Sequence, residues 1–194
     1  MAKDNILGVD IGTGSIKALA GMTDESGRIA ILGCGTVPAA GLNKGELAAP
    51  ELVAQAVKEA VDCAAMAADI TPGRIYLGIG GMDIAGINNT GSVAISGLVA
   101  ENSIEQACRA ALVTSITDDR YILHVLPTDY WVDGRKTYSP LGMGGRRLDV
   151  KAHIVTGGEP GIKKLFAALE TAGVPVAGIM ANSVVGSQIG RAHV

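Results

Sequence analysis

The chain has few aromatic residues, few cysteines and no long apolar run. Aromatic side chains make up 3% of its 194 residues, and its three cysteines, Cys34, Cys63 and Cys108, lie far apart among apolar or small residues. An odd number of scattered cysteines is typical of reduced, packed side chains rather than of a metal cluster. No apolar run approaches the roughly 20 residues of a membrane-spanning helix, and residues 1–5 lead into a strand pattern without a signal-peptide core. The sequence therefore predicts a cytoplasmic protein.

An excess of charge of one sign is also missing. The chain carries 16 Lys and Arg against 19 Asp and Glu, with a formal net charge of -3 and no basic run. Proteins that bind nucleic acid normally present a basic patch or stripe, so nucleic acid is not an expected partner. A hydrophobic content of 48% with 18% charged residues is instead typical of a folded chain that buries a sizeable core.

Apolar periodicity predicts alternating strands and helices in the first part of the chain. A meander of three strands is followed by a helix that begins at Pro50 and ends before the breaker Thr71-Pro-Gly73, and then by another buried strand. The expected strands span residues 6–10, 16–22, 29–37 and 75–79.

The pattern changes after Gly81 and reverts near Gly158. Between them the sequence predicts a β-rich insert with one helix, capped by Asn102 or Ser103, in which Ser103 and Gln106 fit a capping box. The expected strands of the insert span residues 84–95, 121–126, 130–132 and 148–155. A further helix from Pro160 to Gly173 and an extended segment over residues 174–180 complete an interrupted α/β domain.

The strand over residues 6–10 leads into a small polar loop that is suited to hold a phosphate. Glycines at positions 12 and 14 let successive backbone N–H groups point at an anion, while Asp10 at the end of the strand could face a magnesium ion. The spacing matches neither a Walker loop nor a dinucleotide fingerprint. The loop also suits a β-hairpin turn, and the two interpretations are compatible. The candidate nucleotide-binding residues are Asp10, Gly12, Thr13, Gly14, Ser15 and Lys17.

The motif Asp10-Ile-Gly-Thr-Gly-Ser-Ile-Lys17 resembles the first phosphate loop of the actin-like superfamily. Further segments, collinear across nearly the whole chain, resemble the FtsA family of bacterial cell-division proteins. These segments span residues 41–45, 75–81, 122–127, 140–145 and 150–157. The resemblance implies an α/β fold: an actin-like (ribonuclease H-like) half-domain with an inserted α+β subdomain that is SHS2-like and called 1C. It places an incomplete subdomain 1A at residues 1–82 and 157–188, and subdomain 1C at residues 83–156.

The same resemblance implies a role in cell division. In the family the loop over residues 12–15 would cradle the phosphates of ATP, Lys17 would neutralise their charge, and Asp10 would position Mg²⁺ through water. The expected protein is a nucleotide-binding cytoskeletal subunit with at most weak ATPase activity, not an enzyme. It self-associates into filaments and tethers FtsZ to the cytoplasmic side of the bacterial inner membrane at the division site. It also helps recruit later division proteins through the inserted subdomain.

Two alternatives stay open at this point. One is an actin-like protein of pilus assembly, which shares the inserted subdomain, although residues 41–45 and 122–127 favour the division protein. The other is an ATPase or sugar kinase of the superfamily. A kinase needs a catalytic carboxylate and sugar-contacting polar residues near the cleft, and the sequence assigns neither.

The resemblance also implies that this chain is an amino-terminal fragment. A full family member continues into a second phosphate loop, an adenosine-binding segment, a second actin-like half and a carboxyl-terminal amphipathic helix that binds the membrane. We therefore expect the fragment to be soluble and cytoplasmic, and to bind ATP and Mg²⁺ weakly or not at all. Residues 189–194 back-translate readily to a common sequencing-adapter sequence, and we expect them to be non-native.

Overall fold

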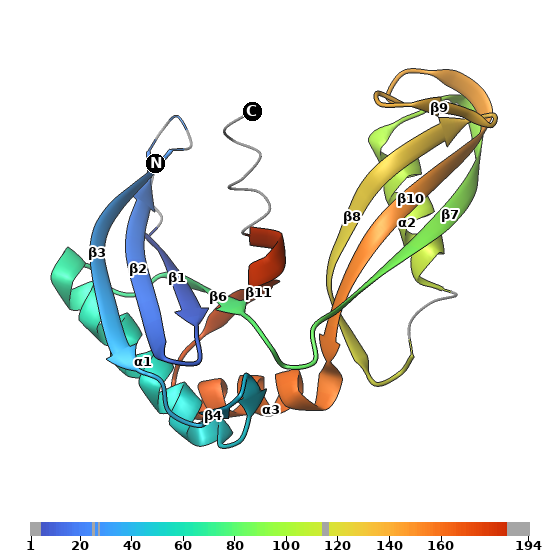
Figure 1. Cartoon of the computed structure of the whole chain (residues 1–194). Coiled ribbons are helices and arrows are strands. Elements are labelled where there is room, and N and C mark those ends of the chain that lie inside the picture. The colour runs from blue at the N-terminus through green and yellow to red at the C-terminus, as the bar shows by residue number, and fades with distance from the viewer. Residues whose placement is uncertain (1–4, 25, 27, 114–116, 186–194) are drawn as a thin grey trace. The chain divides into compact units, whose positions relative to one another are not determined.

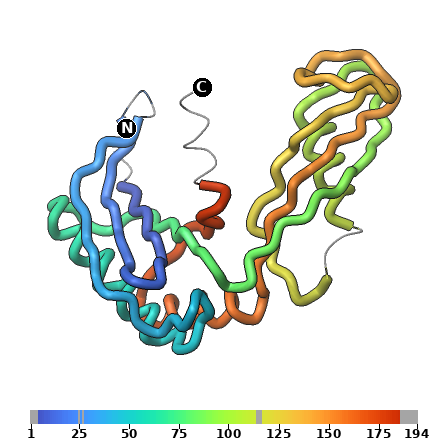
Figure 2. Tube along the Cα trace, viewed as in Figure 1, coloured from blue at the N-terminus to red at the C-terminus, as the bar shows by residue number. Residues whose placement is uncertain are grey.

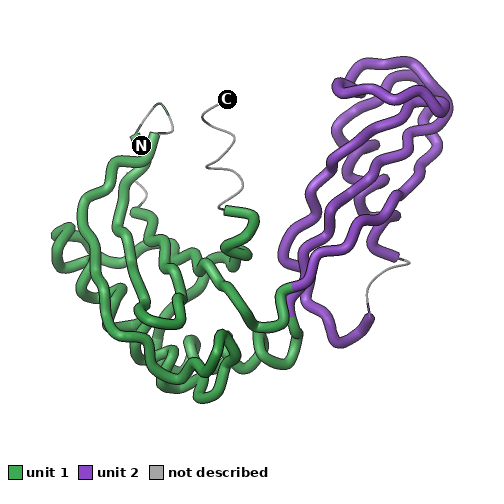
Figure 3. Tube along the Cα trace, in the orientation of Figure 1, with its two compact units in different colours: residues 1–84, 158–194 green, residues 85–157 purple. Residues whose placement is uncertain are grey.

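The computed structural model describes residues 5–24, 26, 28–113 and 117–185, so the predicted non-native tail over residues 189–194 lies outside the described residues. The chain forms two compact units (Figure 3). Unit 1 comprises Met1–Ile84 with Gly158–Val194, and unit 2 comprises Ala85–Gly157. The range predicted for the insert, 83–156, differs from unit 2 by two residues at its start and one at its end. The assignment of the units to subdomains 1A and 1C stays a prediction.

Unit 1 is built on a five-stranded sheet in the order β11-β6-β1-β2-β3 (Figure 1). β1, β2 and β3 form the predicted antiparallel meander, whereas β6 and β11 run parallel to β1. β11 comes from the far end of the described chain, as its red colour in Figure 2 shows, so the sheet joins segments that are distant in sequence. The strands are β1 Asn5–Ile11, β2 Ser15–Thr23, β3 Ile29–Pro38, β6 Arg74–Ile79 and β11 Val176–Ala181.

Helix α1 (Pro50–Ala68) packs on one face of this sheet and contacts α3 (Glu159–Thr171). Proline in the first turn starts each helix, and α1 ends at Asp69, whose φ of 52° is left-handed. The helix approaches β3 closely because Gly33 and Gly35 have no side chain: a Cβ on Gly33 would lie 2.7 Å from the Ala64 carbonyl oxygen. Side chains such as Leu7, which is fully buried, each stabilise this core by roughly 1.5–3 kcal/mol.

None of the helices in the described ranges is long and apolar enough to cross a membrane.

A short hairpin that the sequence did not predict lies between β3 and α1. Its strands, β4 (Leu42–Asn43) and β5 (Glu46–Leu47), are joined by a turn in which Lys44 and Gly45 have φ values of 50° and 85°. Two-residue turns of this kind need left-handed residues at both central positions. Two-residue strands carry no measurable apolar alternation, which is why the pattern analysis missed them.

The turn between β4 and β5 contacts the segment that follows β6 and forms a hydrogen bond with it. The Met82 N–H donates to the Gly45 carbonyl at 3.1 Å, and a Cβ on Gly81 would overlap that same oxygen. Gly81, Met82 and Asp83 are all left-handed, with φ values of 69°, 50° and 55°. The Met82 carbonyl accepts a hydrogen bond from the Gly158 N–H at 3.1 Å, so the chain leaving unit 1 and the chain returning to it are joined.

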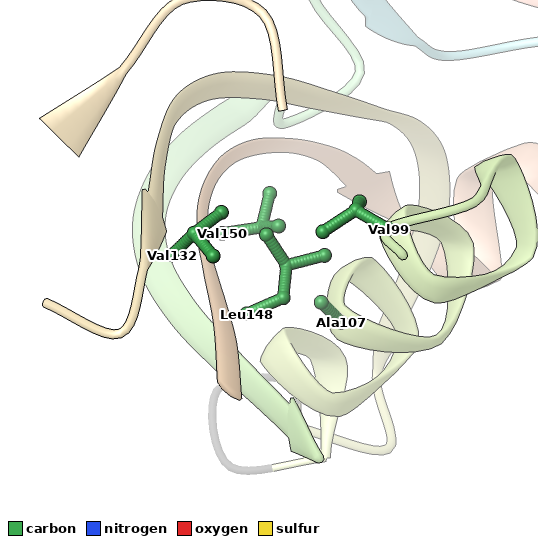
Figure 4. Close-up of a cluster of buried hydrophobic side chains, with 5 residues drawn as sticks. All are labelled: Val99, Ala107, Val132, Leu148 and Val150. Carbon is green, nitrogen blue, oxygen red and sulfur yellow. The ribbon is translucent and has the colours of Figure 1, made fainter. Parts of the chain in front are cut away.

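Unit 2 is a four-stranded sheet in the order β7-β10-β8-β9 with one helix packed on it. A core cluster between α2 and the sheet contains Val99, Ala107, Val132, Leu148 and Val150 (Figure 4). Gly91 of β7 admits the helix backbone, since a Cβ there would overlap the Ala107 carbonyl. The elements are β7 Ala85–Leu98, α2 Glu101–Leu112, β8 Arg120–Val132, β9 Arg135–Thr137 and β10 Gly144–Gly158.

Two local predictions for the insert are wrong. Helix α2 is capped at Ala100 rather than at Asn102 or Ser103, and the Ser103 hydroxyl accepts from the Ala100 N–H at 3.4 Å instead of pairing with Gln106. The two predicted strands over residues 121–126 and 130–132 are one strand, β8, which continues through Pro127. β9 pairs only with residues 130–132, so β8 is an edge strand at Pro127, where a missing N–H is tolerated.

Candidate functional site

The predicted phosphate loop connects the two strands of a β-hairpin. The hairpin-turn interpretation of the motif therefore holds, and it is compatible with phosphate binding by the same residues. β1 ends at Ile11 and β2 begins at Ser15, with Asp10 and Lys17 as direct partners across the pair. Neither Gly12 nor Gly14 has a positive φ. Position 12 requires glycine for a steric reason, because a Cβ there would lie 2.8 Å from the Ser15 carbonyl oxygen. A Cβ on Gly14 would meet nothing within 4 Å.

The polar groups of this connection are available for a ligand. Thr13 is exposed and Ser15 half-buried, and within the described residues neither hydroxyl has a hydrogen-bond partner. The loop backbone is anchored at the other side, since the Gly14 carbonyl accepts from the Ala39 N–H at 3.2 Å. Hydroxyls without protein partners can donate to an anion such as a phosphate.

Asp10 and Lys17 lie on the sheet face opposite α1. Along β2, Ile16 and Ala18 are fully buried while Lys17 and Leu19 between them are exposed, as the alternation of a strand requires. The exposed face is hollowed to a volume of about 550 Å³. The hollow is lined by Gly8, Val9, Asp10, Lys17, Ala18, Leu19, Cys34, Gly35, Thr36, Tyr76, Gly78, Met180, Asn182 and Val185. The structure thus brings two of the predicted residues into one hollow, while residues 12–15 do not line it.

The charges in the hollow are not paired with each other. No ion pair of Lys17 exists among the described residues, and its side chain is exposed. The Asp10 carboxylate instead accepts a hydrogen bond from the Asn182 side chain, Nδ2 to Oδ1, at 2.8 Å. An unpaired ammonium beside unpaired hydroxyls is a site that a phosphate group fits.

Asn182 is a candidate site residue that the sequence analysis missed. It follows β11 directly, and the register pairs Ile79 of β6 with both Ile11 of β1 and Ala181 of β11. Polar residues that follow parallel strands meet at the carboxyl edge of the sheet. The signal was a polar side chain at the end of an apolar strand, but only the strand order reveals which strand lies nearby.

The residues present fit a hydrated magnesium ion better than a metal held by protein ligands alone. In the described ranges, no group of three or more His, Cys, Asp or Glu side chains could hold a metal. Mg²⁺ commonly keeps several waters and binds one or two carboxylates together with substrate phosphates. Asp10, exposed at the edge of the hollow, is the one carboxylate among the described lining residues and could act in this way.

The prediction that the cysteines are packing residues is wrong for Cys34, which is exposed and lines the hollow. Cys108 does pack against the core cluster of unit 2, and burial raises the pKa of its thiol. All three cysteines are free thiols. Cys34 was misjudged because its neighbours, Gly33 and Gly35, face α1, and alternation sends the side chain between them to the other face.

A second, larger hollow of about 820 Å³ lies along α1 and α3. Its lining residues are Pro50, Glu51, Gln55, Lys58, Lys164, Ala167, Ala168, Thr171 and Ala172. It contains none of the predicted site residues, whereas the smaller hollow contains Asp10 and Lys17 and is therefore the better candidate.

Comparison with known proteins agrees with this architecture. Residues 81–156 match the family described as the SHS2 domain inserted in FtsA. The chain is 37% identical, over 153 residues, to the cell division protein FtsA of Pseudomonas aeruginosa, a match that covers 78% of this chain and 37% of that protein. This chain belongs to the FtsA family. FtsA of Neisseria meningitidis is 32% identical over 182 residues, covering 93% of this chain and 44% of its own length. The chain therefore spans less than half the length of these FtsA relatives.

The fold predicted for an FtsA-family chain is confirmed. A solved structure described as the PilM-PilN type IV pilus biogenesis complex superposes with a TM-score of 0.61, covering 94% of this chain and 48% of that chain. The sequence identity is 18%, so this likeness speaks for the fold alone. Together with the SHS2 match, it identifies an actin-like α/β fold with an inserted α+β subdomain.

Proposed function

We propose that this FtsA-family chain supplies part of an ATP- and Mg²⁺-binding site in an actin-like cell-division protein. The observation that carries the proposal is the Lys17 ammonium, which has no ion pair within the described part of the chain and is the register partner of Asp10, one residue pair from the hairpin loop, in a chain of this family. The names of its relatives, cell division proteins, support the cellular role. Because the chain spans less than half of those relatives, the activity and partners below concern the whole protein.

Each residue of the hairpin has a definite task in the proposed site. Lys17 offers a point charge to the terminal phosphates, and the Thr13 and Ser15 hydroxyls donate hydrogen bonds to their oxygens. Asp10 would hold a hydrated Mg²⁺ through its water, as is common for Mg²⁺ bound between a carboxylate and the phosphates of a nucleotide.

We propose that the whole protein uses this site as a binding switch rather than for fast turnover. Asp10 is the one carboxylate among the described lining residues, and the cation occupies it, so it is not available as a general base. The nucleotide-bound protein self-associates into filaments and tethers FtsZ to the cytoplasmic side of the inner membrane at the division site. A carboxyl-terminal amphipathic helix makes the membrane contact, and the inserted subdomain recruits later division proteins.

Two measurements test this function on a full-length FtsA that carries residues 5–185 of this chain. Isothermal titration calorimetry should detect ATP binding that depends on Mg²⁺. Sedimentation with preformed FtsZ filaments should bring the protein into the pellet, whereas type IV pilus assembly proteins should leave it in the supernatant. Co-pelleting with the pilus proteins alone would replace cell division by the pilus alternative.

A further inference from the structure

Among the described residues, the side chain that holds Asp10 comes from a strand end distant in sequence, after β11. Asn182 follows β11, and its Nδ2 donates to Asp10 Oδ1 at 2.8 Å. A carboxylate only accepts hydrogen bonds, so the amide nitrogen must face Asp10 and the amide carbonyl must face away. This hydrogen bond is charge-assisted, a class that is about twice as strong as hydrogen bonds between neutral groups.

The strand between Asp10 and Asn182 leaves room for the Asn182 amide because it has a glycine at the point of contact. β6 lies between β1 and β11, and its Gly78 pairs with Asp10 on one side and with Met180 on the other. A Cβ on Gly78 would lie 2.5 Å from Asn182 Oδ1, so any other residue would push the amide out of place. Gly80, the next residue on this face, would bring a Cβ to 3.6 Å from Asn182 Nδ2. The backbone next to the Asn182 amide therefore carries no side chain at Gly78 or Gly80.

The consequence for Asp10 is a fixed carboxylate plane. The terminal torsion of an aspartate is broad and roughly two-fold, so an exposed carboxylate without partners presents either oxygen. Here Oδ1 is engaged by Asn182, and among the described residues Oδ2 has no partner. A single oxygen is thus left without a partner among the described residues, on a residue that lines the hollow and pairs with Lys17 in the sheet register.

We propose that Asn182 is a positioning residue of the nucleotide site, which orients Asp10 so that its free oxygen receives the water shell of Mg²⁺. The inference rests on the proposed ATP- and Mg²⁺-binding function. Asn182 itself acts only through Asp10, and Gly78 is the position that gives it room.

The test compares Mg²⁺-dependent ATP binding in a full-length FtsA that carries residues 5–185 of this chain. Calorimetry is run with Mg²⁺ and with EDTA on the parent, Asn182→Ala and Asn182→Leu, the last of which keeps the branching at Cγ but cannot donate a hydrogen bond. Both variants should lose roughly three- to tenfold in ATP affinity with Mg²⁺ and nothing with EDTA, as expected for one lost charge-assisted contact that acts indirectly. Asn43→Ala, at an exposed asparagine that does not line the hollow, is the matched control and should change neither value.

A double-mutant cycle shows whether Asn182 acts through Asp10. In an Asp10→Asn background, Asn182→Ala should have no further effect on the Mg²⁺ dependence. An equal loss in that background, or an equal loss with EDTA, would overturn the positioning role. A parent protein that binds ATP without any Mg²⁺ dependence would instead refute the proposed function itself, so the two failures are distinguishable.

Discussion

Lys17 and Asp10 are direct partners in the sheet register and carry opposite charges, and yet they do not form an ion pair with each other. Asp10 accepts from Asn182, and Lys17 has no ion pair among the described residues. An exposed pair of this kind is worth at most about 1 kcal/mol, so leaving it open costs the fold little. The lysine is thus available to a ligand at low cost.

Lys17→Ala should weaken ATP binding in a full-length FtsA that carries this segment. A hydrogen bond to a charged group contributes roughly 1.5–3 kcal/mol, which corresponds to a loss of about ten- to a hundredfold in affinity. Calorimetry measures the affinity, and circular dichroism checks the fold. Lys58→Ala is the control, because Lys58 is also exposed but pairs with Asp62 at 2.9 Å on α1. Equal affinity in the parent and in Lys17→Ala would remove this lysine from the site.

The two glycines of the hairpin loop should respond differently to alanine. A Cβ on Gly12 would lie 2.8 Å from the Ser15 carbonyl oxygen, so Gly12→Ala forces the loop backbone to move and should lower the free energy of unfolding by about 1–3 kcal/mol. Gly14→Ala meets nothing within 4 Å and should change it by less than about 0.5 kcal/mol. Urea denaturation of this chain measures both. Similar losses in the two variants would show that steric contact is not the reason for Gly12.

Site residues that are close in the sequence could be predicted as neighbours, whereas residues that are far apart in the sequence could not. Asp10 and Lys17 could be placed side by side from the sequence, because a short loop between two apolar runs pairs their flanks. Asn182 could not, because it meets Asp10 only through the strand order β11-β6-β1, which involves parallel strands with long crossovers. The steric reason for Gly12 could not be predicted either, because the spacing of the motif does not show that a Cβ would meet the Ser15 carbonyl.

Helices of this protein pack closely against strands at glycine residues, which have no side chain. β3 meets α1 at Gly33 and Gly35, and β7 meets α2 at Gly91. The helix and strand pattern predicted that these elements exist, because apolar periodicity is strong over long segments. It did not predict the α2 cap at Ala100, whose side chain cannot cap, because the backbone there is set by packing and by the reciprocal bond from Ser103.

Gly35→Ala and Gly8→Ala form a matched pair for this mode of packing. A Cβ on Gly35 would overlap the Ala60 carbonyl of α1, so Gly35→Ala should lower the free energy of unfolding by about 1–3 kcal/mol. A Cβ on Gly8, in the same sheet, would meet nothing within 4 Å, and Gly8→Ala should raise stability by roughly 0.5 kcal/mol through lower unfolded-state entropy. Chemical denaturation compares them. A neutral Gly35→Ala would mean that α1 shifts away freely.

Each unit of the whole molecule has its own core. In unit 2 this core is the cluster around Leu148, which is fully buried and does not draw on unit 1 residues. Ala85 at the start of β7 pairs with Thr156 near the end of β10, so the two ends of the unit lie next to each other. A segment with adjacent ends and its own core is organised to fold alone.

Residues 85–157 should therefore fold when expressed by themselves. Circular dichroism should report both helix and strand, and the denaturant transition should be cooperative. Leu148→Ala should cost about 2–5 kcal/mol and unfold much of this small domain, whereas Leu141→Ala, at a side chain that is 50% exposed, should be nearly neutral. A peptide without cooperative unfolding would show that unit 2 depends on the rest of the chain.

The hydrogen bond between the Gly158 N–H and the Met82 carbonyl bears on how such a protein could arise. It joins, within unit 1, the backbone just before the chain enters unit 2 and the backbone where the chain returns from it. An ancestral gene could have received the insert at this codon position without separating any strands of its host. The same site would accept a foreign domain with adjacent ends, such as a fluorescent reporter, as readily as it holds the present one.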